Sequence, residues 1–181
     1  MDATAIIADV KRRFVAMAED PPYVYRETPR ELIEQHHQRL TTFVGYAEDE
    51  IAKVEDGLRI RLPLVFRRYL LEMCKSPGDL FQGSDLAGIG DFEQFRADAL
   101  ALMAETNAAL SLPPEAVVFL FHQGYTFVYL LALGGFDGPV LQYTETEREP
   151  RELAPAFAEL LDSELHLMES SHRDFHKRGG Y

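Results

Sequence analysis

Residues 117–145 constrain the fold of this chain more than any other stretch. Three short runs rich in β-branched and aromatic residues follow one another there, separated by Gly and Pro, and this composition is typical of β-strands. The sequence predicts strands at 117–122, 125–133 and 139–144. Because the connections are long enough only for hairpins, the three strands should be antiparallel neighbours.

The middle strand of the three is apolar on both of its faces. Successive side chains of a strand point to opposite faces. One face should carry Tyr125, Phe127, Tyr129 and Leu131, and the other should carry Thr126, Val128, Leu130 and Ala132. We therefore expect this strand to be covered on both sides. The aromatic face could instead be a platform for a ligand or partner, but core packing is the simpler interpretation.

Apolar residues at helical spacing lie on both sides of these strands. They predict helices at 4–18, 28–45, 48–55, 62–74, 91–103 and 155–169. Thr28 and Glu31 should form a capping box at the start of the second helix, and Gly57 should end the third. A short strand is expected at 80–81 and a polar connection at 145–152. Together these elements indicate one α+β domain, with helices flanking a mostly antiparallel central sheet.

The charge of the chain limits the partners that suit it. The 181 residues carry a formal net charge of −12 at pH 7. That sign repels phosphate backbones, so nonspecific binding of nucleic acid is not expected. It would favour a basic protein partner through electrostatic steering, although solubility alone is also a sufficient reason for it.

Three features favour a cytoplasmic protein without a membrane partner. No window approaches the ~18 uninterrupted apolar residues of a membrane span. The N-terminus lacks the basic region and long apolar run of a secretory signal. Cys74 is the single cysteine, so the chain cannot form an internal disulfide.

Each arrangement that could carry chemistry has a simpler structural interpretation. Cys74 could be a nucleophile with His122 as its base, but free cysteines are usually buried. His172 and His176, with Glu169, could share a helix face and hold a metal, yet a solvated helix end explains them as well. The glycines lack the spacing of a phosphate-binding loop. We therefore predict no catalytic, cofactor-binding or metal-binding residue.

Two acidic clusters are the candidate partner-binding residues. One surrounds the third helix and includes Asp49 and Glu50, with Glu55 and Asp56 nearby. The other follows the third strand, and its members are Glu145, Glu147, Glu149 and Glu152. Both clusters should be exposed, where solvation is the simpler interpretation. The functional hypothesis is a surface that mimics nucleic acid toward a basic protein, with association that weakens as salt rises.

Four signals occur in an order that is characteristic of a known family. They are an acidic helix at 48–55, a helix opened by Leu62-Pro63, a strand leading through Gly124 into an aromatic strand, and Asp137-Gly138-Pro139-Val140 before the next strand. In this order the chain resembles the SMI1/KNR4 family, also called the SUKH superfamily, over roughly residues 44–169. It departs from the family at Gly138, where a proline is common, and in the turn at 75–79.

The resemblance implies a non-catalytic protein-binding domain of α+β fold, with residues 1–43 as an N-terminal helical extension, 44–169 as the core and 170–181 as a frayed tail. Bacterial members are widely regarded as immunity proteins against secreted toxins, many of them nucleases, and fungal members act as regulatory scaffolds. The leading hypothesis is thus an immunity protein that binds a basic toxin domain. The alternatives are an intracellular scaffold and a small hydrolase with an unrecognised site.

Overall fold

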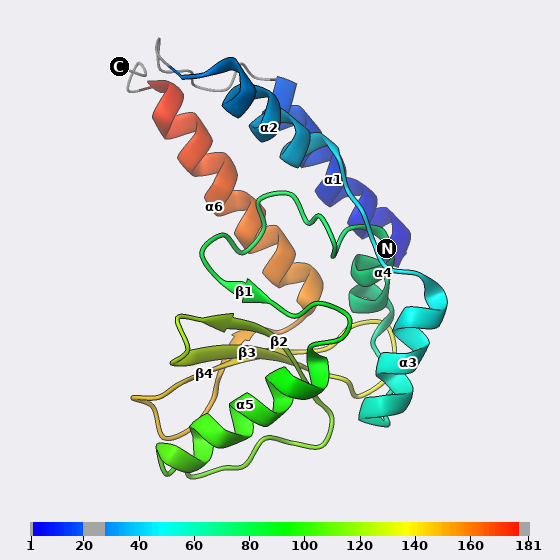
Figure 1. The fold of residues 1–181 in the computed structure, drawn as a ribbon, viewed down its shortest axis with the longest axis vertical. Coiled ribbons are helices and arrows are strands. Elements are labelled where there is room, and N and C mark those ends of the chain that lie inside the picture. Colours follow the sequence, from blue (N-terminus) through cyan, green and yellow to red (C-terminus); the bar gives the residue numbers. More distant parts are fainter. Residues whose placement is uncertain (1, 20–27, 178–181) are drawn as a thin grey trace.

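A five-stranded antiparallel sheet lies at the centre of the protein, with its strands in sequence order β1-β2-β3-β4-β5 (Figure 1). The computed structural model describes residues 2–19 and 28–177, with side chains up to Arg173. The strands are β1 (Asp85–Leu86), β2 (Ala116–His122), β3 (Thr126–Leu131), β4 (Val140–Thr144) and β5 (Arg151–Ala154). The helices are α1 (Ala3–Glu19), α2 (Arg30–Thr41), α3 (Glu48–Leu58), α4 (Leu64–Glu72), α5 (Phe92–Glu105) and α6 (Phe157–Lys177). The predicted α+β class is confirmed.

The three predicted strands are β2, β3 and β4, and they pair as antiparallel neighbours. Phe127 of β3 stands opposite Phe121 of β2 and Tyr143 of β4. The register of β2 shifts between Val118 and Leu120, which is the signature of a β-bulge. The hairpin turns that the Gly and Pro breaks predicted therefore exist.

Two edge strands differ from the prediction. The first edge strand is β1 at Asp85–Leu86, whereas residues 80–81 form a turn, so the strand predicted there is wrong. The second is β5, which begins within the segment predicted as a polar connection, 145–152, and continues to Ala154. Only Ala154 of β5 is buried, so this strand carries almost no apolar alternation for a sequence pattern to detect.

Both faces of the middle strand are covered, as predicted. Helix α5 lies over the face that carries Phe127 and Tyr129, and α4 and α6 lie over the face that carries Val128 and Leu130 (Figure 1). The aromatic face is therefore mostly core, and only Tyr125, in the β2–β3 turn, is exposed. Core packing, rather than a partner platform, explains these aromatic residues.

Two predicted helix signals are wrong. Helix α2 starts at Arg30 with Pro29 in the N-cap position, and no side chain caps it, so Thr28 does not form a capping box. Helix α3 continues through Gly57 to Leu58, and Arg59 takes the left-handed conformation with φ 56°. The glutamate half of a capping box occurs instead at α3, where the Ala47 N–H donates to Glu50 Oε2 at 2.7 Å.

The motif Asp137-Gly138 joins the β3–β4 loop to the start of α6. The Asp137 carboxylate accepts hydrogen bonds from the N–H groups of Phe157 and Ala158, each at 3.0 Å. These are donors that a helix N-terminus leaves without partners. A Cβ on Gly138 would lie 2.4 Å from the Leu131 carbonyl oxygen. Only glycine allows this close approach of the loop to β3.

Helix α1 is part of the main core although it precedes the stretch that carries the family resemblance. Its buried residues, among them Ile7 and Phe14, belong to the same cluster as α4, α6 and one face of the sheet. Arg13 anchors it to α6, because the guanidinium donates to Glu169 through two nitrogens at 2.7 and 3.0 Å and to Asp162 at 2.6 Å. The mostly buried Arg13 lowers the pKa of the Glu169 carboxyl below its usual value, chiefly through this hydrogen bond.

Replacing Arg13 with alanine should lower the free energy of unfolding by about 1–3 kcal/mol, because charge-assisted hydrogen bonds are lost and Glu169 is left unpaired. Urea denaturation measures this. Arg12→Ala is the matched control, since Arg12 is mostly exposed and forms its ion pair locally with Asp9.

The effect of Arg13 should also depend on pH. A carboxyl group whose pKa is lowered by folding stabilises the folded protein at pH values above its pKa in the unfolded chain, and this stabilisation is lost as the pH falls through its pKa in the folded protein. The difference between the wild type and Arg13→Ala should therefore be full at pH 7 and shrink below about pH 4.

Gly45 lies where two backbone segments approach closely. Residues 44–46 pair with the end of α4, where the Tyr46 N–H donates to the Leu70 carbonyl at 2.8 Å. A Cβ on Gly45 would lie 1.9 Å from the Leu71 carbonyl oxygen.

Gly45→Ala should therefore destabilise the protein by about 2 kcal/mol or more. In thermal and urea unfolding, Gly90→Ala should be nearly neutral, because a Cβ there meets nothing within 4 Å. Equal stability of the two variants would contradict this packing.

Candidate functional site

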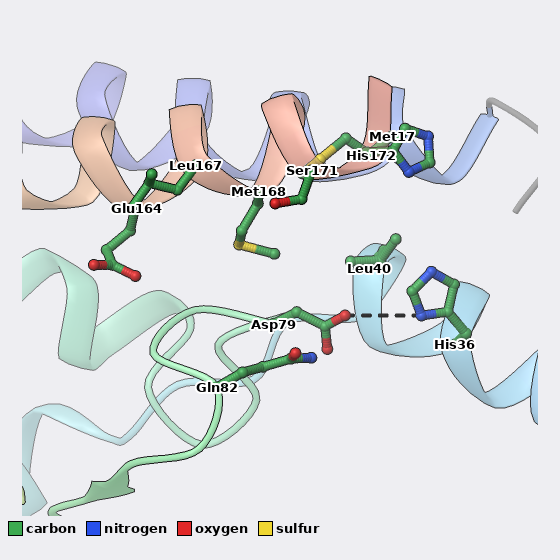
Figure 2. A pocket seen from close by; sticks show the side chains of 10 residues that line it. All are labelled: Met17, His36, Leu40, Asp79, Gln82, Glu164, Leu167, Met168, Ser171 and His172. Carbon is green, nitrogen blue, oxygen red and sulfur yellow. Dashed lines mark ion pairs between the residues drawn. The ribbon is translucent and has the colours of Figure 1, made fainter. Parts of the chain in front are cut away.

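A hollow of about 470 Å³ lies between α6, α2 and the loop that precedes β1 (Figure 2). Helix α6 contributes Glu164, Leu167, Met168, Ser171 and His172 to its wall, and the other lining residues are Met17, His36, Leu40, Asp79 and Gln82. Figure 2 shows Met168 of α6 extending toward the loop that carries Asp79 and Gln82. The hollow therefore brings together four segments that are far apart in the sequence.

The periodicity of α6 explains why this helix has one face in the core and another in the hollow. Leu161 and Leu165 are fully buried against the rest of the core. Glu164, Leu167, Met168 and Ser171 recur at three- and four-residue spacing, so they share a neighbouring face of the helix. Leu167 is 65% exposed, although it lies on an otherwise well-packed helix. This face of α6 lines the hollow rather than the core.

The loop opposite α6 is held by its own buried residues. Leu80 and Phe81 are buried, and Gly78 has φ +69°, where a Cβ would lie 3.0 Å from the Phe14 ring. Asp79, only 8% exposed, receives a hydrogen bond from Arg39 Nε at 3.0 Å. His36 Nδ1 lies 3.7 Å from Asp79, the dashed contact in Figure 2, but 3.1 Å from Arg39 Nη2. The nearer contact has Nδ1 as an acceptor, so Arg39 rather than His36 balances the charge of Asp79.

A second hollow of about 360 Å³ adjoins the first, at the end of the sheet. Its wall includes Leu120, Val128 and Gln142 from β2, β3 and β4, and Leu153 from β5. Gln82 and Glu164 line both hollows. We refer to the two adjoining hollows as the α6 groove.

Glu164 is the carboxylate at the junction of the α6 groove. It is half-buried, and that burial raises its pKa. Among the residues that the structure describes, none forms a hydrogen bond or ion pair with it. A charge in this position is desolvated without the compensation that buried charges usually have.

The structure does not bring Cys74 and His122 together. Cys74 is buried at the end of α4, and this burial raises the pKa of its thiol to about 12. His122 Nδ1 instead lies 3.2 Å from Ser84 Oγ, in the second hollow. A serine–histidine contact resembles part of a hydrolase site, but in the described chain no carboxylate is hydrogen-bonded to His122 to orient it.

Glu169, one of the possible metal ligands, is engaged with Arg13, as described above. His172 lies in the wall of the groove, and the side chain of His176 is outside the described residues. The described residues contain no group of three or more His, Cys, Asp or Glu side chains that could hold a metal ion.

The acidic residues around α3 are largely paired within the protein. Glu48 forms a two-nitrogen ion pair with Arg67, and Lys75 Nζ lies 3.3 Å from Glu50. Glu55, expected to be exposed, is buried and accepts the Leu62 N–H at 2.8 Å, so it holds the start of α4 rather than a partner. Asp49 is exposed and lies 3.6 Å from Lys53.

The second acidic cluster lies in the β4–β5 loop and, with Glu152, in β5, away from α3 (Figure 1). Glu145 and Glu149 are exposed, whereas Glu147 is partly buried and lies 3.8 Å from Arg151. The structure therefore separates the two predicted clusters. The β4–β5 loop begins beside Thr144, which pairs with Thr126 at the mouth of the second hollow.

Comparison with known protein families agrees with this architecture. The profile of the SMI1/KNR4 family (SUKH-1) matches residues 45–163, and the chain belongs to that family. No curated protein matches the chain. Within residues 2–19 and 28–177, no helix combines the length and apolar character needed to cross a membrane. The match ends one residue before Glu164, and it leaves out α1, α2 and most of the α6 side of the groove.

Sequence reasoning did not identify the α6 groove. Glu164 lies on the polar side of an ordinary amphipathic pattern, and Asp79 and Gln82 lie in a loop. The one available signal was Leu167, a large apolar residue that is out of phase with the buried stripe of α6. A single such residue is common on protein surfaces, so this signal is weak.

Cys74 should be unreactive in the folded protein. Both its burial and its raised pKa keep the thiol protonated and covered. At pH 8, Ellman's reagent should modify the thiol only after denaturant is added, and a free small thiol is the control for reagent quality. Rapid modification of the native protein would contradict the buried position.

Proposed function

We propose that this protein is an immunity protein, which binds a cognate toxin domain in the cytoplasm and blocks it without chemistry. Membership of the SMI1/KNR4 family carries the proposal, because that family includes immunity proteins. The buried thiol of Cys74 and the separate place of His122 support binding rather than catalysis. The proposed partner is basic, as many nucleases are.

The acidic charge supports a basic partner. A net charge of −12 accelerates encounter with a basic protein at low ionic strength. Glu145 and Glu149 in the β4–β5 loop are the better placed of the predicted residues for this steering. Glu50 and Glu147 already contact Lys75 and Arg151, while Asp49 is exposed on α3.

Stoichiometry distinguishes a binding inhibitor from an enzyme. A fixed amount of the toxin domain encoded beside the gene is titrated with this protein, and the remaining toxin activity is measured. An immunity protein should abolish activity at one equivalent, with no further loss over time below that point. Progressive inactivation by substoichiometric amounts would support the hydrolase hypothesis, and His122→Ala and Ser84→Ala variants would then identify its residues. Lack of protection against every neighbouring toxin would contradict the proposal.

Reversing two charges in the β4–β5 loop should slow association with the toxin. The double variant Glu145→Lys, Glu149→Lys should reduce the association rate by about 3- to 10-fold at low salt, with little change in the dissociation rate. The variant Asp49→Lys, Asp56→Lys on α3 is the control, because it alters the net charge equally. Stopped-flow fluorescence at two salt concentrations measures both. A larger effect of the α3 variant on the association rate would show that the steering surface lies on α3 instead.

A further inference from the structure

The α6 groove combines features that suit a specific kind of partner segment. It is open, it is formed by apolar side chains on both sides of one carboxylate, and it joins two hollows of about 470 and 360 Å³. Together these hollows follow α6 from Leu160 to His172. A single small molecule would fill one hollow, whereas a peptide segment can occupy both.

The carboxylate of Glu164 defines the charge of the groove. The other carboxylate in the wall, Asp79, is already paired with Arg39. Glu164 has no such cation among the described residues, and its burial raises its pKa. A lysine or arginine from outside would supply the missing opposite charge, and the pair would gain strength as the complex excludes water. An anionic group beside Glu164 would be repelled by its charge.

The apolar walls indicate what should flank that cation. Leu167 is 65% exposed and Leu153 is 38% exposed, one beside each hollow. Met17 and Met168 line the first hollow, and flexible methionine side chains adapt to different apolar surfaces. Gln82 and Ser171 are uncharged hydrogen-bonding groups that can pair with a peptide backbone.

We propose that the α6 groove binds a segment of the partner protein in which a lysine or arginine lies between large apolar side chains, with the cation pairing with Glu164 and the apolar residues covering Leu153 and Leu167. This proposal rests on the proposed function as a protein-binding domain. It assigns the tight contact to α6, whereas the β4–β5 loop accelerates encounter.

A peptide probe tests the groove without the toxin. The probe is an acetylated and amidated octapeptide of alternating leucine and lysine, and glutamate or serine replaces every lysine in the two matched peptides. Fluorescence anisotropy measures affinity, and amide chemical shifts locate the binding site. The lysine peptide should bind saturably, with shifts confined to α6, Gln82 and the adjoining ends of the strands. Equal binding of the serine peptide, or shifts centred on another surface, would overturn the proposal.

Two substitutions on α6 isolate the role of Glu164. Glu164→Gln keeps the shape of the side chain and removes its charge, so affinity for the lysine peptide should fall at least about 10-fold. Glu159→Gln makes the same change at an exposed position of the same helix and should change affinity by less than about 2-fold. Equal effects of the two substitutions would overturn the assignment. Leu167→Asp should also abolish binding, while Leu110→Asp, at another exposed leucine, should not.

Stability separates a binding role for Glu164 from a structural one. Folding raises the pKa of Glu164, so the charged form destabilises the free protein at pH values above the unfolded pKa. Glu164→Gln should therefore leave the free protein as stable as the wild type, or more stable, at pH 7. A clear loss of stability would show that Glu164 holds the fold together and would overturn the proposal.

The toxin experiment distinguishes the two proposals from each other. If the wild type protects against the toxin and Glu164→Gln weakens the complex by faster dissociation, both proposals hold. If the wild type protects and Glu164→Gln and Glu159→Gln are equivalent, the groove assignment fails while the immunity function stands. If the wild type gives no protection but the lysine peptide binds the groove, the immunity function fails and the groove serves another partner.

Discussion

The packing of the Phe157 ring fixes the position of α6 against α4 and the sheet. Phe157 opens α6, and its ring packs edge-on against Phe66 at 4.9 Å, Tyr69 at 5.3 Å and Phe119 at 5.7 Å between ring centroids. These neighbours belong to α4 and β2, so one side chain joins two helices to the sheet. The Asp137 carboxylate fixes the same end of α6 by accepting hydrogen bonds from two N–H groups of its first turn. Because both contacts hold the first turn, the direction of the whole helix is determined there.

Helix α6 presents faces with different surroundings. One face carries Leu161 and Leu165 into the core, and another carries Asp162 and Glu169 to Arg13 of α1. On the face between α2 and the sheet, Glu164 has no hydrogen-bond or ion-pair partner among the described residues, and Leu167 is exposed. A desolvated carboxylate costs free energy in the isolated protein. Such a cost is typical of residues that act in binding, since the compensating charge arrives with the partner.

The carboxylates of this acidic chain fall into two groups, one paired within the fold and one exposed to solvent. Around α3, Glu48, Glu50 and Glu55 hold Arg67, the Ala47 N–H and the Leu62 N–H, so they belong to the architecture of the domain. In the β4–β5 loop, Glu145 and Glu149 are exposed and remain available for long-range attraction. Net charge alone supports steering of a basic partner, but it does not say which carboxylates take part.

The sequence by itself determined the three central strands, the helical segments around them, the α+β class and the family. Those features depend on local signals, namely residue alternation, helical spacing and the positions of Gly and Pro. Only the tertiary structure decided that Glu55 is buried, that residues 151–154 form an edge strand, and that Glu164 lies half-buried in a groove. The reason is physical: the environment of a polar side chain is set by residues distant in the sequence, such as Gln82 beside Glu164, and periodicity along one segment carries no information about them.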